Sequence, residues 1–386
     1  MKTETMTSRE RVLRAINRQE PDRMPIDLGM HMSTGISIFA YWDLREYLGL
    51  PTDRIWIPDM VQGLAYVDRD ILERFHCDCI LLEPLFPETR QWNPRGKYCF
   101  AIPATADPRL RENGEWVIQK GNEVMRMPAD GYFFDGDWIN DWGEGSEDDR
   151  LALYAREAER IYKETDYATN MLGYSRGLGM ENYGGGVIED AILAFDNPAR
   201  LREIREAQLE KSIRRMGKVI DRFGRYIQMV TVSDDMGGQS GLLCGTDYVE
   251  AFCMPYYKRF CAFVHENSDI KVFMHNCGAI RPLIPQIIDA GIDVLNPVQI
   301  SATGMDPQEL KDEFGDRICF WGGGCDTQNV LGSGTPEDVA ENVRHLVRIF
   351  KPGGGFIFNQ VHNILGNVPP GNIVAMLDTA YGESFY

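Results

Sequence analysis

The sequence predicts an α/β protein with the architecture of a distorted (β/α)8 TIM barrel. Two observations support this prediction: eight short apolar runs are separated by helical segments, and most of these runs are uninterrupted by polar residues. Uninterrupted apolar runs are typical of parallel strands that are buried on both faces. The expected strands are Pro25–Gly29, Cys79–Glu83, Met171–Tyr174, Tyr226–Ser233, Val272–His275, Val294–Pro297, Cys319–Trp321 and Gly355–Asn359.

The helices between these strands are predicted from capping residues and from apolar periodicity. Thr7–Glu10 is a capping box, so the first helix is expected over residues 8–18. Helices over 306–315 and 335–350 each start with a capping side chain followed by proline. Between residues 199 and 223, apolar residues recur mostly at gaps of three or four, which predicts one long amphipathic helix.

Residues 87–146 interrupt this pattern and are expected to form an insertion that decorates the barrel. The stretch is rich in Trp, Gly, Asp and Pro, and the runs 116–119 and 123–127 form a predicted hairpin across a Lys-Gly-Asn turn. Its tryptophans fit either a lid or aromatic wall beside the site, or a small satellite core. These tryptophans are Trp92, Trp116, Trp138 and Trp142. Since no linker or repeat divides the chain, residues 1–386 are expected to form a single domain.

Composition excludes several classes of function. The 386 residues include 40 basic and 58 acidic ones, a net charge of −18 that would repel nucleic acid and anionic membrane surfaces. No segment approaches the roughly 18 uncharged apolar residues of a membrane span, and the charged N-terminus is no secretory signal. Nine unevenly spaced cysteines suggest reduced thiols. We therefore expect a cytoplasmic enzyme without nucleic-acid or membrane partners, for which a homodimer is considered.

Metal-binding side chains gather after the last five expected strands, where a TIM barrel has its active site. His275 and Cys277 are two residues apart in an extended segment, so their side chains point the same way. Cys325 follows a strand two positions further around the rim. Two thiolates and one imidazole suit zinc and leave its fourth position open. The sequence thus predicts a zinc site with the ligands His275, Cys277 and Cys325.

Other polar residues near the strand ends are candidates for substrate binding. Asp234 and Asp235 are adjacent, so at most one of them faces the pocket directly. His31 follows the first strand and His362 follows the last, and each either lines the site or bonds to the backbone. The motif over 76–79, His-Cys-Asp-Cys, is a weaker metal candidate, because it lies between a helix and a strand and is expected to belong to the core and a turn.

Several long stretches resemble the uroporphyrinogen decarboxylase superfamily, over nearly the whole chain. The stretches are MTSRERVLRAINRQEPDRMPIDLG, VSDDMGGQSG, HNCGAIRPLIPQIIDAGIDVLNPVQ, FWGGGCDTQNVLGSGTPEDV and GGGFIFNQVHNILGNVPPGNIVAM. The resemblance implies a distorted (β/α)8 barrel. In this superfamily, true decarboxylases bind a porphyrinogen through an arginine-bearing loop after the first strand, whereas another branch comprises zinc methyltransferases that work with corrinoid proteins. Here that loop, DLGMHMSTG, has no arginine. His275, Cys277 and Cys325 match the zinc pattern of the methyltransferase branch.

The resemblance therefore implies the methyltransferase component of an anaerobic aromatic O-demethylase. Zinc would act as a Lewis acid on the ether oxygen of a methoxylated aromatic compound, and Co(I) of a separate corrinoid protein would take the methyl group. No cobalamin-binding sequence is apparent, so the corrinoid is expected on a partner protein. Three alternatives stay open: methyl transfer from a corrinoid to a thiol such as coenzyme M, decarboxylation of a porphyrinogen, and a non-enzymatic barrel with a structural zinc.

Overall fold

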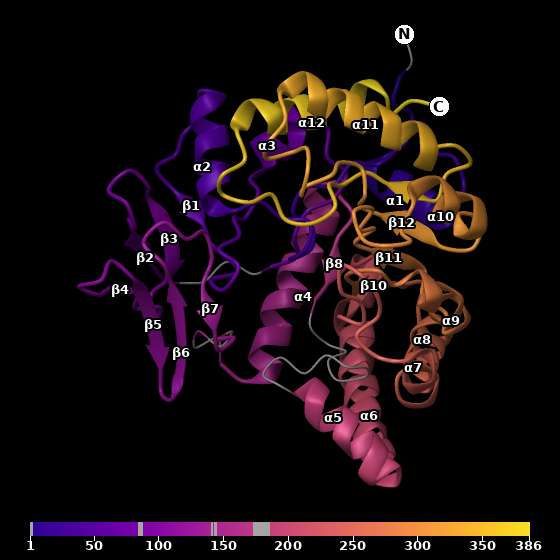
Figure 1. The fold of residues 1–386 in the computed structure, drawn as a ribbon. Coiled ribbons are helices and arrows are strands. Elements are labelled where there is room, and N and C mark those ends of the chain that lie inside the picture. Colours follow the sequence, from indigo (N-terminus) through magenta and orange to yellow (C-terminus); the bar gives the residue numbers. More distant parts are fainter. Residues whose placement is uncertain (1–2, 84–87, 140–141, 143–144, 173–185) are drawn as a thin grey trace.

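The computed structural model describes residues 3–83, 88–139, 142, 145–172 and 186–386. Its centre is a six-stranded parallel sheet in the order β13-β12-β11-β10-β9-β8 (Figure 1). The strands are β8 (Asn170–Met171), β9 (Met229–Asp234), β10 (Lys271–Asn276), β11 (Val294–Asn296), β12 (Cys319–Trp321) and β13 (Phe356–Ile357). They coincide with the last six expected strands, although residues 173–174 of the third lie outside the described part.

Two short stretches connect the edges of this sheet. Ile26 forms a parallel bridge with Phe358 just after β13, and Cys79 forms one with Ala168 just before β8. The two stretches are joined by a backbone hydrogen bond of 2.7 Å from the Asp78 amide to the Ile26 carbonyl. The first two expected strands are therefore present as single bridges rather than as regular strands. The fold is TIM-barrel-like, with regular parallel strands over only part of the ring.

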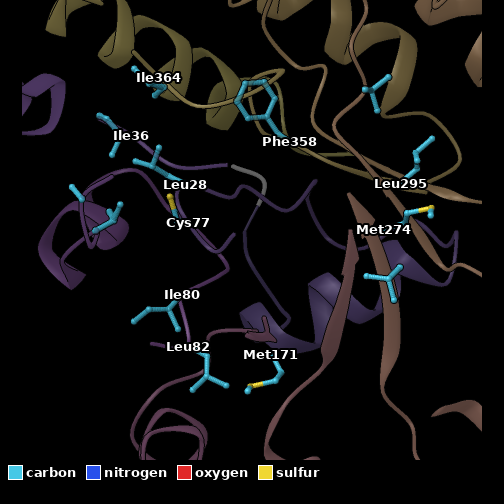
Figure 2. Packing of buried hydrophobic residues seen from close by; sticks show 14 of the residues in the cluster. Leu28, Ile36, Cys77, Ile80, Leu82, Met171, Met274, Leu295, Phe358 and Ile364 are labelled. Carbon is cyan, nitrogen blue, oxygen red and sulfur yellow. The ribbon is translucent and has the colours of Figure 1, made fainter. Parts of the chain in front are cut away.

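The six-stranded sheet and the two bridged stretches together form the wall of the barrel, and apolar side chains pack against both of its surfaces. Figure 2 shows members of the larger buried cluster, contributed by segments around the ring: Leu28, Ile80, Met171, Met274, Leu295 and Phe358. Residues adjacent to these in sequence form a second buried cluster, because neighbouring residues of a strand face opposite surfaces. That cluster contains Cys79, Met229, Phe273, Val294, Cys319, Trp321 and Ile357, together with Val12, Ala15 and Ile16 of the first helix. The first helix thus packs against the filled interior of the ring.

Helices alternate with the strands as predicted. They are α1 (Ser8–Ile16), α2 (Ile38–Tyr47), α3 (Arg69–Arg74), α4 (Glu147–Glu164), α5 (Gly186–Asp196), α6 (Pro198–Phe223), α7 (Thr246–Phe252), α8 (Met254–Asn267), α9 (Ile284–Asp289), α10 (Pro307–Phe314), α11 (Pro336–Phe350) and α12 (Pro370–Gly382). The predicted caps are confirmed: Thr7, Asp306 and Thr335 each accept a backbone hydrogen bond at a helix start. Within the described residues, none of these helices combines the length and apolarity that crossing a membrane requires.

The insertion, together with a short strand that precedes it in the chain, forms two small sheets beside the barrel (Figure 1). One contains β1 (Ile55–Trp56), β2 (Thr89–Trp92) and β3 (Phe100–Pro103), and the other contains β4 (Arg109–Leu110), β5 (Trp116–Lys120), β6 (Glu123–Met127) and β7 (Asp135–Gly136). The hairpin β5–β6 confirms the predicted one.

Most tryptophans of the insertion are buried in a part of the core that continues the larger cluster of the barrel. The rings of Trp92 and Trp116 pack edge to face with centroids 5.5 Å apart, and Trp92 also lies beside Phe134. Trp142 is buried, whereas Trp138 is 37% exposed. Of the two expectations for these residues, a core position describes Trp92, Trp116 and Trp142 better than an aromatic wall beside the site, but this core is continuous with that of the barrel.

The motif over 76–79 divides between the core and an exposed turn at His76, as expected. The thiols of Cys77 and Cys79 are buried, and the ring of His76 stacks on Tyr381 with centroids 3.6 Å apart. The fully buried carboxylate of Asp78 accepts a hydrogen bond from the backbone amide of Ile26 at 2.9 Å. The motif therefore joins the first two bridged stretches of the wall.

We expect Asp78→Ala to destabilise the fold strongly. The Asp78 carboxylate pairs with the buried guanidinium groups of Arg11 at 2.6 Å and Arg23 at 2.7 Å; without it, Arg11 keeps Asp22 and Glu4, whereas Arg23 keeps the partly exposed Glu4. Breaking a buried ion pair costs about 3–5 kcal/mol. Urea denaturation measures this cost. The control Asp378→Ala removes only an exposed pair with Arg74 and should change stability little; equal effects of the two variants would contradict the prediction.

Candidate metal centre

Three side chains that can ligate a metal meet where β10 and β13 end. One ligand atom each from His275, Cys277 and His362 lies within 4.8 Å of the others. Across the described residues, this is the group of three His, Cys, Asp or Glu side chains found at such spacing. Nitrogen and sulfur donors are the ligands that zinc prefers. We call these three residues the metal group.

The alternation along β10 and the residue after it places two of the three members of the metal group. Phe273 belongs to the interior cluster, so His275 and Cys277, two and four residues further on, follow on the same side. His275 is 8% exposed, and its Nε2 lies 3.4 Å from Sγ of Cys277. The sequence expectation that these two side chains share one direction thus agrees with their placement.

Two glycines allow the loops after β9 and β10 to cross at the metal group. Gly278 has a φ of +89°, and a Cβ atom there would lie 2.3 Å from the backbone of Gly237. A Cβ at Gly237 would in turn lie 2.7 Å from the carbonyl oxygen of Cys277. This close crossing brings Asp235, two residues before Gly237, to the metal group: its Oδ1 lies 3.8 Å from Nε2 of His275.

The adjacent aspartates point in different directions. Asp234 is 1% exposed and accepts a hydrogen bond of 2.9 Å from the hydroxyl of Tyr257 in α8, so it holds the end of β9 against this helix. The side chain of Asp235 is 53% exposed and faces His275. Of the two candidates for substrate binding, the structure therefore brings Asp235 to the site and turns Asp234 away from it.

Burial sets the protonation of the metal-free group. Burial lowers the pKa of His275, although the negative charge of Asp235 opposes the shift. Burial, together with the neighbouring His275, lowers the pKa of His362 to about 3. Burial raises the pKa of the Cys277 thiol well above its usual value, and Asp235 raises it further. At neutral pH both imidazoles are therefore neutral, whereas the thiol holds its proton until a metal displaces it.

Cys325 is not part of the metal group. Its thiol is fully buried within the larger apolar cluster, and burial raises its pKa. Its carbonyl oxygen accepts a hydrogen bond of 3.1 Å from the amide of Val361, the residue before His362. Of the three ligands expected from sequence, the structure brings His275 and Cys277 together. It adds His362, which was expected to contact substrate.

His31 lies beside the metal group. Its ring stacks on His275 with centroids 5.6 Å apart and contacts Phe273 at 5.0 Å. Its Nδ1 lies 2.7 Å from Oγ of Ser33, and the Ser33 hydroxyl donates to Oδ1 of Asn296 at 2.6 Å. Sequence reasoning did not find Ser33 and Asn296; Asn296 nevertheless stands at a strand end, where side-chain chemistry is expected.

The fold and the site together define a TIM-barrel-like α/β protein with a His/Cys centre at its strand ends. Residues 193–382, just under half of the chain, match the model of the uroporphyrinogen decarboxylase (URO-D) family. The uroporphyrinogen decarboxylase of Chlorobium luteolum is 30% identical over 144 residues, which cover 36% of this chain and 38% of that protein. The one of Chlorobium limicola is 25% identical over 260 residues, covering 61% and 66%. The matches thus span less than two thirds of these relatives.

A solved structure of a methyltransferase from Methanosarcina mazei shares the fold over nearly the full length. The TM-score is 0.60, with 14% sequence identity, and the alignment covers 98% of this chain and 99% of that one. At this identity the likeness concerns the fold. The URO-D resemblance inferred from the sequence is thus confirmed for the C-terminal half of the chain.

Proposed function

We propose that this chain is a zinc-dependent methyltransferase that demethylates a methoxylated aromatic compound and passes the methyl group to a separate corrinoid protein. The observation that carries the proposal is the metal group at the strand ends, where His275, Cys277 and His362 converge. The fold shared with a methyltransferase is consistent with it. When bound, zinc supplies Lewis-acid activation of the ether oxygen.

The sequence pattern and the geometry of the site both give His275 and Cys277 as ligands. They differ in the third ligand. The sequence pattern supplies Cys325, and the geometry supplies His362. Three protein ligands leave the fourth position of zinc open, as in catalytic sites. Binding by all four residues would close the site and indicate a structural metal instead.

The surroundings of the metal group favour a neutral substrate over a porphyrinogen. Its hydrogen-bond and stacking partners among the described residues are Asn296, Asp235 and His31, none of which carries a positive charge at neutral pH. Carboxylate substrates are commonly held by arginine side chains. The imidazole of His31, which stacks on His275, is instead the ring beside the metal group, and the fully buried Phe273 packs against it.

The insertion reaches the rim through the loop that follows His362, because a Cβ atom at Gly366 would lie 2.1 Å from Cδ1 of Tyr132. The Phe134 amide donates to the carbonyl of Val61 at 2.7 Å, which ties the insertion to the segment after the first bridged stretch. The neighbouring Phe133 is 52% exposed. This rim is where we place the docking of the corrinoid protein.

The proposal is tested with free cob(I)alamin as the methyl acceptor and a panel of uncharged methoxylated aromatic compounds, methoxybenzenes and methoxyphenols, as donors. We expect zinc-dependent formation of methylcobalamin, followed by its absorbance. The same sulfur-containing ligands would also activate a thiol, so methylcobalamin with coenzyme M is the second reaction to assay. Release of CO2 from uroporphyrinogen without any methyl transfer would contradict the proposal and make the chain a decarboxylase.

A further inference from the structure

We infer that Asn296 is a positioning residue that selects the tautomer of His275 and thereby the nitrogen that faces the metal. Asn296 is the last residue of β11, is fully buried, and lies opposite His275 in the register of β10 and β11. Its Oδ1 lies 3.2 Å from Nδ1 of His275. The relevance to zinc rests on the proposed function, but the tautomer itself does not.

The amide of Asn296 has only one orientation that satisfies its neighbours. Its Nδ2 donates to the carbonyl oxygen of Trp321 at 3.0 Å, and its Oδ1 accepts from the hydroxyl of Ser33 at 2.6 Å. A carbonyl oxygen can only accept, so the amide nitrogen must face Trp321 and the oxygen must face the imidazole. Since that oxygen cannot donate, Nδ1 of His275 must carry the proton.

This tautomer leaves the lone pair on Nε2 of His275, the atom 3.4 Å from Sγ of Cys277. The other tautomer would place an N–H group there and leave no nitrogen lone pair for a metal. Metal-bound histidines are commonly fixed in this way by a partner of the second ring nitrogen. Ser33 extends the arrangement, because its Oγ lies 2.7 Å from Nδ1 of His31 and its hydroxyl donates to Asn296. One hydrogen-bonded chain thus orients the two stacked imidazoles.

The tautomer is measured by NMR of the full-length, metal-free protein labelled with ¹⁵N-histidine at pH 8, where His275 is neutral. The His275 signals are assigned with His275→Gln. We expect the wild type and the conservative variant Asn296→Asp, which keeps an acceptor oxygen, to show the Nδ1–H form. Asn296→Leu removes the acceptor and should give a mixture of tautomers. Ser33→Ala should keep the Nδ1–H form, because Asn296 retains its oxygen. An Nε2–H form in the wild type, or an unchanged tautomer in Asn296→Leu, would overturn the inference.

Zinc affinity, measured by competition with a chromogenic chelator, gives the functional consequence. We expect Asn296→Leu to weaken zinc binding by about 10–100-fold, the range for lost partners of metal ligands. We expect Asn296→Asp to recover most of this loss. The control Asn372→Leu removes another buried asparagine, which bonds to the carbonyls of Leu331 and Gly334, and should leave zinc affinity unchanged. Equal losses in both leucine variants would reduce Asn296 to a structural role. If no zinc binds at all, the NMR result still decides the tautomer.

Discussion

His275 and Cys277 are the metal ligands on which the sequence pattern and the structure agree. Replacing either one is expected to abolish both zinc binding and methyl transfer. His275→Ala and Cys277→Ser each remove a donor atom from a group whose members lie within 4.8 Å of one another. If zinc contributes several kcal/mol to activation of the ether oxygen, methyl transfer should fall on the order of 10³-fold or more. Zinc content is measured by mass spectrometry, and methylcobalamin formation by absorbance, on the same preparations.

The matched control for these variants is Cys99→Ser. Cys99 is a partly exposed cysteine outside the metal group whose thiol donates to the carbonyl of Asp53 at 3.4 Å, so its replacement should leave zinc content and activity unchanged. A Cys277→Ser protein with full activity would remove the zinc mechanism. Loss of activity with full zinc content would place the catalytic role of Cys277 outside metal binding.

The number of protons released when zinc binds is expected to identify the third ligand. Burial raises the pKa of the thiols of Cys277 and Cys325, so both are protonated near neutral pH, and each must lose its proton to bind zinc. The pKa values of His275 and His362 are lowered, so these imidazoles bind without releasing a proton. The histidines therefore add nothing to the count near pH 7.

We expect about two protons per zinc, because thiolates are strong zinc ligands and Cys325 completes the ligand pattern of the sequence. Below the thiol pKa values, zinc affinity should then rise by about a hundredfold per pH unit. Proton release is followed with a pH indicator in weak buffer. In this case Cys325→Ser should lose zinc and His362→Ala should keep it. A count of about one, with the opposite behaviour of the two variants, would assign His362 as the ligand.

Much of the fold could be predicted because its determinants are local. Uninterrupted apolar runs and capping residues such as Thr7 and Thr335 act within a few positions of the chain, and these strands and helices were correctly expected. The first two expected strands are less regular than their sequences indicate, because each forms a single bridge. Their apolar runs resemble those of the regular strands, but whether neighbouring backbones continue a ladder beyond one bridge depends on tertiary packing.

The site was predicted only where its spacing is local. His275 and Cys277 are two residues apart on one strand, so their shared direction follows from the geometry of the strand. Asn296, Ser33 and His362 come from other segments, and their contacts with His275 arise from strand register and loop closure. No short motif in the sequence encodes such distances.

Regular strands form only part of the barrel wall, and this has a consequence for how the substrate range of the fold can change. The candidate metal ligands His275, Cys277, Cys325 and His362 lie in or after strands of the regular six-stranded ladder, whereas His31 and the insertion follow the stretches held by single bridges. Backbone amides in the ladder should exchange with solvent more slowly than those near Ile26. Loops that follow the stretches held by single bridges can change length and composition without moving the metal ligands. New substrates can therefore be acquired on one half of the ring, while the chemistry stays fixed on the other.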